Sequence, residues 1–168
     1  MSKIYLAYGS NLNMKQMAVR CPGATPIGVA LINDYGLLFR GSQTGSYLTI
    51  EPKKGMQVYC GAWVVSANHE KSLDIYEGFP NFYIKREMEV KVRMFDKISA
   101  EIDVDRKLGK KTKTMKAFFY TMRMDRPLGV PTSHYVRTCI DGCADFGIPS
   151  YPILFAYNQS VINLKGAV

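Results

Sequence analysis

Residues 83–95 carry a strict alternation of apolar and charged side chains. Met88, Val90, Val92 and Met94 fall on one side of an extended chain, and Glu87, Glu89, Lys91 and Arg93 fall on the other. A period of two predicts a long β-strand with one buried face. Such a strand requires neighbouring strands and a layer that covers its apolar side. The other strand patterns do not alternate regularly with helices, so the sequence predicts an α+β fold rather than a doubly wound parallel sheet.

Short apolar runs and turn signals predict the remaining elements. Strands are expected at residues 3–7, 27–32, 37–39, 47–50, 58–65 and 115–122, with turns at 33–36 and 53–55. Helices are expected from a cap at Asn13 to residue 21, from a cap at Ser66 or Asn68 to a stop at Gly78, and over residues 131–146. Residues 96–114 resemble an exposed loop or hairpin tip, and residues 151–157 fit either a short helix or a strand.

Length and composition indicate a single domain over residues 1–168. Apolar residues make up 47% of the chain and charged residues 21%, which is typical of a globular protein with a sizeable core. No apolar run approaches the roughly 18 residues that a membrane-spanning helix needs. The N-terminal segment lacks the pattern of a secretion signal, so we expect a cytoplasmic protein with reduced cysteines.

The cysteines and histidines do not form a metal-binding pattern. Cys139 and Cys143 are four residues apart in a helical pattern, which predicts small apolar side chains on one face. There is no Cys-x-x-Cys pair, and the chain has only two histidines. Neither a metal nor a cofactor is therefore expected.

Positive charge is concentrated in one segment. The formal net charge is +8, and residues 106–116 hold six lysines and arginines. Such clusters are more often solvated surface than nucleic-acid sites, and no aromatic residues are interleaved here. The sequence thus disfavours nucleic acid as a partner. Binding of nucleic acid or another anion by this basic segment stays the alternative function, with steep salt dependence as its signature.

The segment Tyr8-Gly9-Ser10-Asn11 is the first candidate for a functional site. It follows a predicted strand and precedes a predicted helix, where backbone N–H groups can converge on an anion. Gly9 would permit the close approach of a ligand. The segment lacks the spacing of a Walker loop or a Rossmann fingerprint. Local chemistry alone favours an ordinary tight turn with a serine or asparagine cap.

Glu77 is the second candidate. It shares a helix face with Leu73, lies in the last predicted turn at the negative end of the helix dipole, and stands between Tyr76 and Phe79. Each feature disfavours an ionised carboxylate, which predicts a raised pKa of the kind that functional carboxylates show. The alternative is that the last turn unwinds and Glu77 points to solvent. Spacing alone does not decide between the two.

Four tyrosines lie on predicted strands or just after one: Tyr5, Tyr8, Tyr83 and Tyr120. Tyrosines in such positions are usually half-buried packing residues.

Four segments carry short motifs in a fixed order. They are Ile4-Tyr5-Leu6-Ala7-Tyr8-Gly9-Ser10-Asn11-Leu12, Leu73-Asp74-Ile75-Tyr76-Glu77-Gly78, Ala117-Phe118-Phe119-Tyr120 and the helical segment over residues 131–149. In this order they resemble the γ-glutamylcyclotransferase-like family, which includes AIG2-like relatives that act on γ-glutamylamines. The resemblance runs from about residue 4 to 155. The basic segment and the tail after Phe155 fall outside its motifs.

The resemblance implies a small mixed-strand β-barrel flanked by helices, and an enzyme without a cofactor. The implied substrate is a small γ-glutamyl compound such as glutathione. Its α-amine attacks the side-chain amide carbonyl, which gives 5-oxoproline and releases the attached amine or amino acid. The same fold could instead serve a carrier or another amide-cleaving enzyme.

The resemblance also assigns roles to residues. Glu77 would be the catalytic proton acceptor, and Tyr120 would contact the substrate. Tyr83 is expected to shape the same pocket. The residues expected to line the substrate site are Tyr5, Leu6, Ala7, Tyr8, Gly9, Ser10 and Asn11.

Overall fold

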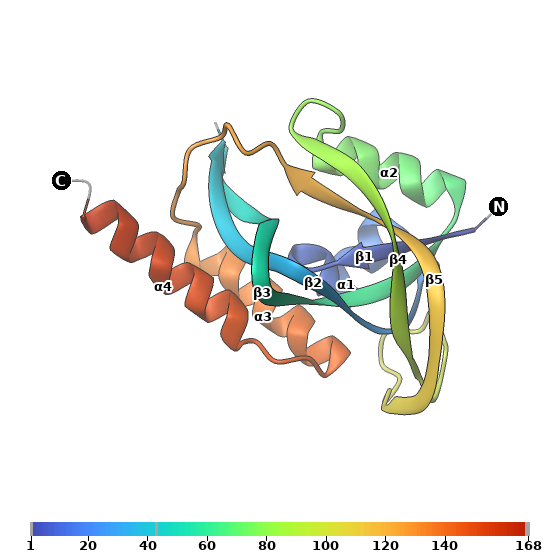
Figure 1. Cartoon of the computed structure of the whole chain (residues 1–168). Coiled ribbons are helices and arrows are strands. Elements are labelled where there is room, and N and C mark those ends of the chain that lie inside the picture. Colours follow the sequence, from blue (N-terminus) through green and yellow to red (C-terminus); the bar gives the residue numbers. More distant parts are fainter. Residues whose placement is uncertain (1, 43, 167–168) are drawn as a thin grey trace.

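Five strands of this computed structural model, which describes residues 2–42 and 44–166, close into a barrel (Figure 1). Around the barrel the order is β1-β3-β2-β4-β5, and every neighbouring pair is antiparallel except β1 with β5. The strands are β1 (Lys3–Ala7), β2 (Thr25–Ser42), β3 (Gly45–Val65), β4 (Tyr83–Phe95) and β5 (Leu108–Met122). The α+β fold with a mixed-strand barrel is therefore confirmed.

Helices flank the barrel (Figure 1). They are η1 (Ser10–Leu12), α1 (Met14–Arg20), α2 (Ala67–Glu77), α3 (Ser133–Phe146) and α4 (Tyr151–Lys165). Helix α3 packs against η1, and α4 packs against β2. Within the described residues, no helix has the length and apolar character required to cross a membrane.

The helix ends follow from local capping. The side chain of Asn13 caps α1, as predicted. Ser66 rather than Asn68 caps α2, and it forms a capping box with His69. At the other end, Gly78 has φ 63°, a left-handed conformation that glycine adopts without a steric penalty. This stop makes Glu77 the last residue of α2.

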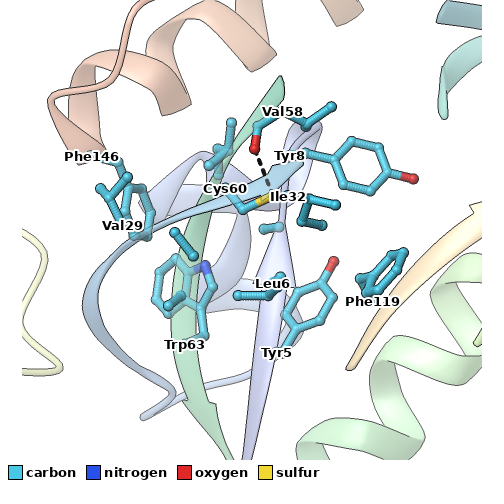
Figure 2. Close-up of a cluster of buried hydrophobic side chains, with 14 of the residues drawn as sticks. Tyr5, Leu6, Tyr8, Val29, Ile32, Val58, Cys60, Trp63, Phe119 and Phe146 are labelled. Carbon is cyan, nitrogen blue, oxygen red and sulfur yellow. Dashed lines mark hydrogen bonds between the residues drawn. The ribbon is translucent and has the colours of Figure 1, made fainter. Parts of the chain in front are cut away.

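The alternating segment forms β4 with the predicted bounds. Val90, Val92 and Met94 are buried, whereas the charged residues between them are exposed. The interior that this face joins is shown in Figure 2, where side chains from β1, β2 and β3 meet. Trp63 and Phe146 close one side of it, with ring centroids 5.4 Å apart.

The turns predicted at residues 33–36 and 53–55 are wrong. Strands β2 and β3 run through both segments and stay paired on either side, from Asn33 with Gln57 to Tyr35 with Pro52. The turn-forming residues are accommodated in a bulge: Asp34 has φ 59°, and its Oδ1 accepts a hydrogen bond from the Gly55 N–H at 2.8 Å. Two long strands therefore replace the four short ones that were predicted.

Two other boundaries differ from the sequence analysis. Strand β5 begins at Leu108, which pairs with Phe95, so residues 96–107 are the expected hairpin tip between β4 and β5, whereas residues 108–114 are a strand. Cross-strand pairing with β4 extends it beyond the apolar residues 115–122. Residues 151–157 take the helical one of the two expected alternatives, and the helix, α4, continues to Lys165.

The basic segment 106–116 therefore divides between a loop and a strand. The Arg106 guanidinium donates to backbone carbonyls of its own loop, including Ser99 O at 2.9 Å, and Lys116 pairs with Glu87 at 2.7 Å. Lys110, Lys111 and Lys113 are exposed on β5. Binding of an anionic partner by these lysines stays a prediction.

Cys139 and Cys143 lie on the buried face of α3, as predicted. Both are free thiols, and burial raises the pKa of each to about 12. Within the described residues no group of three or more His, Cys, Asp and Glu side chains could hold a metal ion.

Candidate functional site

A cavity of about 580 Å³ lies where the turn after β1 meets the end of α2. Its wall contains eight of the ten residues that the sequence singled out: Tyr5, Tyr8, Gly9, Ser10, Asn11, Glu77, Tyr83 and Tyr120. Leu6 and Ala7 do not line it; both are buried, with 0% and 1% of their surface exposed. The residues that complete the wall are Thr44, Tyr47, Leu48, Ile75, Tyr76, Gly78, Phe82, Arg126 and Tyr135.

Glu77 lies in the wall of this cavity with its carboxylate held by Asn11. The Asn11 Nδ2 donates to Glu77 Oε1 at 2.8 Å and also to the Tyr5 hydroxyl at 2.8 Å. Asn11 is 3% exposed, so this contact is shielded from solvent. Helix α2 remains intact through Glu77, which is half-buried. The unwound, solvent-facing alternative is therefore not what the structure shows.

Arg20, at the end of α1, fixes the orientation of the Asn11 carboxamide. Its Nη1 donates to Asn11 Oδ1 at 2.5 Å, which leaves the Asn11 NH₂ group to face Glu77. The same guanidinium stacks 3.7 Å above the Tyr76 ring, and its Nη2 donates to the Tyr76 hydroxyl at 2.6 Å. Two residues of α2 are thus tied to α1 and to the turn after β1.

Burial raises the pKa of Glu77 from 4.5 to about 7. The positive charge of Arg20 and the hydrogen bond from Asn11 act in the opposite direction, because both favour the ionised form. The raised pKa agrees with the sequence analysis, but its cause is desolvation by the whole cavity wall. Phe79, which was expected beside the carboxylate, does not line the cavity and is 38% exposed.

Buried tyrosines form much of the cavity wall, and backbone groups anchor them. The Tyr8 hydroxyl donates to Tyr120 O at 2.5 Å, and the Tyr83 hydroxyl donates to Leu48 O at 2.7 Å. The Leu48 N–H in turn donates to the Tyr135 hydroxyl at 3.3 Å. Burial raises the pKa of Tyr8, Tyr83 and Tyr135 well above the usual range, so these hydroxyls stay protonated.

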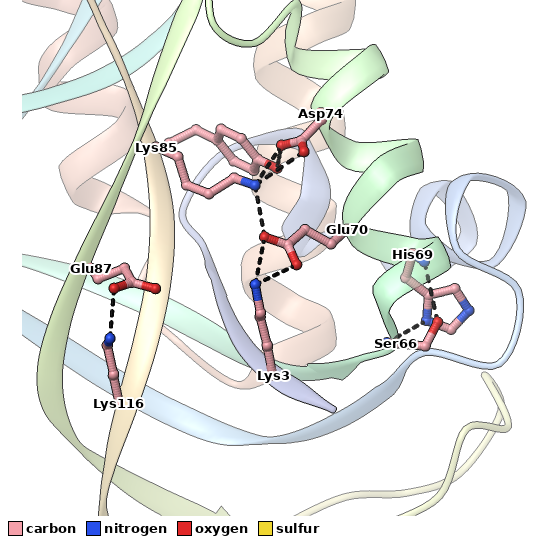
Figure 3. Close-up of polar contacts among 9 residues, drawn as sticks. Lys3, Ser66, His69, Glu70, Asp74, Lys85, Glu87 and Lys116 are labelled. Carbon is pink, nitrogen blue, oxygen red and sulfur yellow. Dashed lines mark hydrogen bonds and ion pairs between the residues drawn. The ribbon is translucent and has the colours of Figure 1, made fainter. Parts of the chain in front are cut away.

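Tyr120 is held by a chain of charges behind the cavity. Its hydroxyl donates to Asp74 Oδ1 at 2.6 Å, and Asp74 pairs with Lys85 at 2.8 Å. Lys85 also pairs with Glu70 at 2.7 Å, and Glu70 pairs with Lys3 at 2.7 Å (Figure 3). Since the Tyr120 proton is committed to Asp74, its oxygen lone pairs are the part left to accept from a ligand.

The backbone at Gly9 approaches the opposite wall closely. A Cβ at this position would lie 3.2 Å from the Tyr135 hydroxyl oxygen and 3.6 Å from Leu48 Cβ. Glycine therefore lets the turn pass against these side chains. Since η1 begins at Ser10, the N–H groups of its first turn have no partner within the helix.

The structure adds residues that the sequence analysis missed. Arg20 and Tyr135 belong to helices whose patterns showed only amphipathic packing, and Thr44, Tyr47 and Phe82 lie near strand ends without a motif. The cluster of polar side chains around Glu77 joins positions up to 66 residues apart. No local signal identifies such contacts. Only the resemblance, which aligned the turn with Glu77, related these segments.

Comparison with known proteins shows which family this chain resembles. The family described as "Gamma-glutamyl cyclotransferase, AIG2-like" matches residues 5–137. The chain belongs to this family. Two proteins named gamma-glutamylcyclotransferase, one from Homo sapiens and one from Bos taurus, are each 28% identical to it over 155 residues. The matches cover 88% of this chain and 73% of each relative.

Solved structures show the same fold. One named "Gamma-glutamyl cyclotransferase" superposes with a TM-score of 0.75 at 24% identity, covering 93% of this chain and 86% of its own. A human protein described as uncharacterized superposes with a TM-score of 0.70 at 27% identity, covering 90% and 84%. A yeast structure described as specific to glutathione has a TM-score of 0.57 at 12% identity, covering 95% and 96%. The first and third similarities concern the cyclotransferase fold alone.

Proposed function

We propose that this family member is an active γ-glutamyl cyclotransferase that converts small γ-glutamyl compounds into 5-oxoproline and a free amine or amino acid. The observation that carries the proposal is the Glu77 carboxylate, held by Asn11 in the wall of a 580 Å³ cavity with a pKa of about 7. A cavity of this size accommodates a whole small ligand.

The raised pKa suits Glu77 to act as a base toward an amine. A free α-ammonium group has a pKa near 8 and must lose a proton before its nitrogen can attack. An ordinary glutamate, with a pKa near 4.3, would take that proton at a cost of roughly 5 kcal/mol. A pKa of about 7 reduces the cost to roughly 1.4 kcal/mol.

Glu77 can serve both halves of the reaction. The attacking nitrogen forms a bond to the γ-carbonyl carbon, and the bond from that carbon to the departing nitrogen breaks. Of the three ammonium protons, one stays on the lactam nitrogen and two end on the departing amine. The protonated carboxyl, now an acid, delivers a proton to the departing nitrogen. Ring closure is intramolecular, so a wall that holds the substrate folded back supplies much of the acceleration.

The turn after β1 supports the charged parts of the substrate in this proposal. The N–H groups of Gly9 and Ser10 are proposed to bind either the oxyanion of the tetrahedral intermediate or the substrate α-carboxylate. Tyr120, whose hydroxyl proton goes to Asp74, can accept a hydrogen bond from the substrate. Tyr5, Tyr8 and Tyr83 shape the surrounding wall.

Two further properties are proposed with this function. Residues 1–168 act as a single domain, which the pairing of β1 with β5 in one closed barrel supports. The protein works in the cytoplasm, which its four free, buried cysteines support.

Release of 5-oxoproline from a panel of γ-glutamyl dipeptides, glutathione and γ-glutamylamines tests the proposal. We expect turnover of at least one panel member, and a loss of about 10²-fold or more for Glu77→Gln. Glu89→Gln, an exposed change on β4 outside the cavity, is the matched control. Turnover by Glu77→Gln within a few-fold of the unaltered protein would remove Glu77 from the mechanism.

A further inference from the structure

Two charged side chains line the cavity within the described part of the chain, Glu77 and Arg126. The proposed reaction uses Glu77 and leaves Arg126 without a role. Arg126 lies in the segment between β5 and α3, and its guanidinium is positively charged at all relevant pH values. Its neighbour Asp125 is engaged elsewhere, in an ion pair with Arg123 at 3.2 Å. No ion pair neutralises Arg126 among the residues of 2–42 and 44–166.

The Arg126 guanidinium is held in place but keeps hydrogen-bonding capacity. Its carbon lies 4.2 Å from the centre of the Phe82 ring, and its Nη2 donates to Asn81 O at a long 3.4 Å. Its Nε is buried and has no partner within the described residues. The backbone oxygen of Arg126 accepts from Arg40, which anchors the segment to β2. A guanidinium has five N–H donors, so with Nε buried and one Nη2 hydrogen donated, the remaining Nη hydrogens are the ones left for a ligand.

Arg126 and Glu77 lie among different residues of the cavity wall. The Arg126 guanidinium carbon is 4.2 Å from the centre of the Phe82 ring, whereas the Glu77 carboxylate is held by Asn11, which also binds Tyr5. The cavity therefore presents an acid from one group of wall residues and a cation from another. A substrate whose α-amine meets Glu77 directs its departing amine into the remaining space.

Building on the proposed function, we propose that Arg126 is a specificity-determining residue that binds a free carboxylate on the departing amine. A carboxylate matches the planar fork of a guanidinium and can accept two parallel hydrogen bonds. A departing amine that lacks a carboxylate would displace water from the Arg126 guanidinium without replacing the hydrogen bonds of that water. Binding of such a substrate is therefore disfavoured. The cavity is thus suited to γ-glutamyl amino acids and peptides over simple γ-glutamylamines.

Matched substrates test this inference. γ-Glutamyl-alanine and γ-glutamyl-alaninamide have the same shape and differ in the carboxylate, and glutathione carries its carboxylate one residue further away. For each, kcat/KM is compared between the unaltered protein and Arg126→Met, so that intrinsic reactivity cancels. We expect Arg126→Met to lower kcat/KM about tenfold, or about 1.4 kcal/mol, for one or both carboxylate substrates and less than twofold for the alaninamide. The substrate that loses more kcat/KM, γ-glutamyl-alanine or glutathione, identifies which carboxylate Arg126 binds.

Two other variants complete the test. Arg126→Lys keeps the charge but loses the planar fork, so it should retain only part of the preference, whereas Arg137→Met, an exposed change on α3 outside the cavity, should leave it unchanged. Arg126→Gln replaces the methionine variant if that protein does not fold. An equal loss of kcat/KM on all three substrates would mean that Arg126 binds the glutamyl α-carboxylate or supports the fold. No loss on any of them would mean that Arg126 has no role in the reaction. Either result overturns this inference and leaves the proposed cyclotransferase function standing. If the unaltered protein turns over none of the three but does turn over a γ-glutamylamine, this inference alone fails. If it turns over no member of the wider panel, the proposed function fails and this inference fails with it.

Discussion

The Asn11 carboxamide donates to Glu77 Oε1 at 2.8 Å and so joins the turn after β1 to the last residue of α2. Because Arg20 binds the oxygen of the same carboxamide, the NH₂ group is the end that faces Glu77. A flipped amide would place two oxygens together and leave Arg20 against two donors. The carboxylate is therefore oriented before a substrate enters, which spares the reaction the cost of arranging it.

The pKa of Glu77 predicts how activity depends on pH. Since the ionised carboxylate is the base, kcat/KM should rise tenfold per pH unit on the acid side and level off near pH 7, where Glu77 titrates. The cavity tyrosines Tyr5, Tyr8 and Tyr83 should not change the rate in this pH range, because burial raises their pKa values further above neutrality. Initial rates of 5-oxoproline release at subsaturating substrate, from pH 5 to 9, measure the profile. An acid limb centred near pH 4.5 would show that Glu77 is ordinary, or is not the base.

The same raised pKa predicts that Glu77 lowers the stability of the folded protein at neutral pH. The folded state holds the Glu77 proton up to about pH 7, whereas the unfolded chain releases it near pH 4.5. The free energy of unfolding therefore falls as pH rises between these two values. Glu77→Gln removes this dependence and keeps an oxygen for Asn11, so it should be more stable than the unaltered protein by on the order of 2 kcal/mol at pH 8. Below pH 4.5 the difference should vanish.

Urea unfolding at pH 4, 6 and 8 measures that difference. Glu89→Gln, an exposed change on β4 outside the cavity, provides the control. A Glu77→Gln protein that is less stable at pH 8 would contradict the sign of the argument.

Sequence patterns that span a few residues predicted many of the helices and strands around this site, but few of the contacts within the cavity. The alternation in β4, the Asn13 cap and the Gly78 stop depend on neighbours within a few residues, and each is found where the sequence indicates. The same local rules failed at Asp34, where turn-forming residues lie within two long strands. Long-range pairing on both sides of the bulge outweighed the local preference for a turn.

The contacts around Glu77 show why the interior was not predictable. Arg20 lies nine residues from Asn11 and 56 from Tyr76, yet it binds both. On the predicted helix, Arg20 was indistinguishable from any basic residue in a last turn, where arginine is common for electrostatic reasons. Its role depends on how α1 and α2 pack together, which no spacing within either helix encodes.

Arg20→Met should shift the pH profile upward and lower activity at neutral pH. The change removes the positive charge that favours ionised Glu77 and frees the Asn11 carboxamide to turn. At pH 7 we expect a loss of about tenfold or more in kcat/KM, with partial recovery as the pH rises towards 9. Lys15→Met, an exposed change on the same helix, should alter neither quantity. A uniform loss at all pH values would indicate that Arg20 serves the fold alone.

Gly9→Ala should impair activity more than stability. The added Cβ would lie 3.2 Å from the Tyr135 hydroxyl oxygen, so either the turn or the tyrosine must move by a few tenths of an ångström. Because this contact is only slightly too close, the free energy of unfolding should fall by about 1 kcal/mol, at the low end of the usual cost of overpacking. Movement of the turn would carry Ser10 and Asn11 with it, and misplaced catalytic groups commonly cost about 10²-fold in rate.

Gly166→Ala, whose Cβ would meet only Ile162 O at 3.7 Å, is the control in parallel measurements of 5-oxoproline release and thermal unfolding. Full activity in Gly9→Ala would mean that the close approach of this turn to Tyr135 has no part in catalysis.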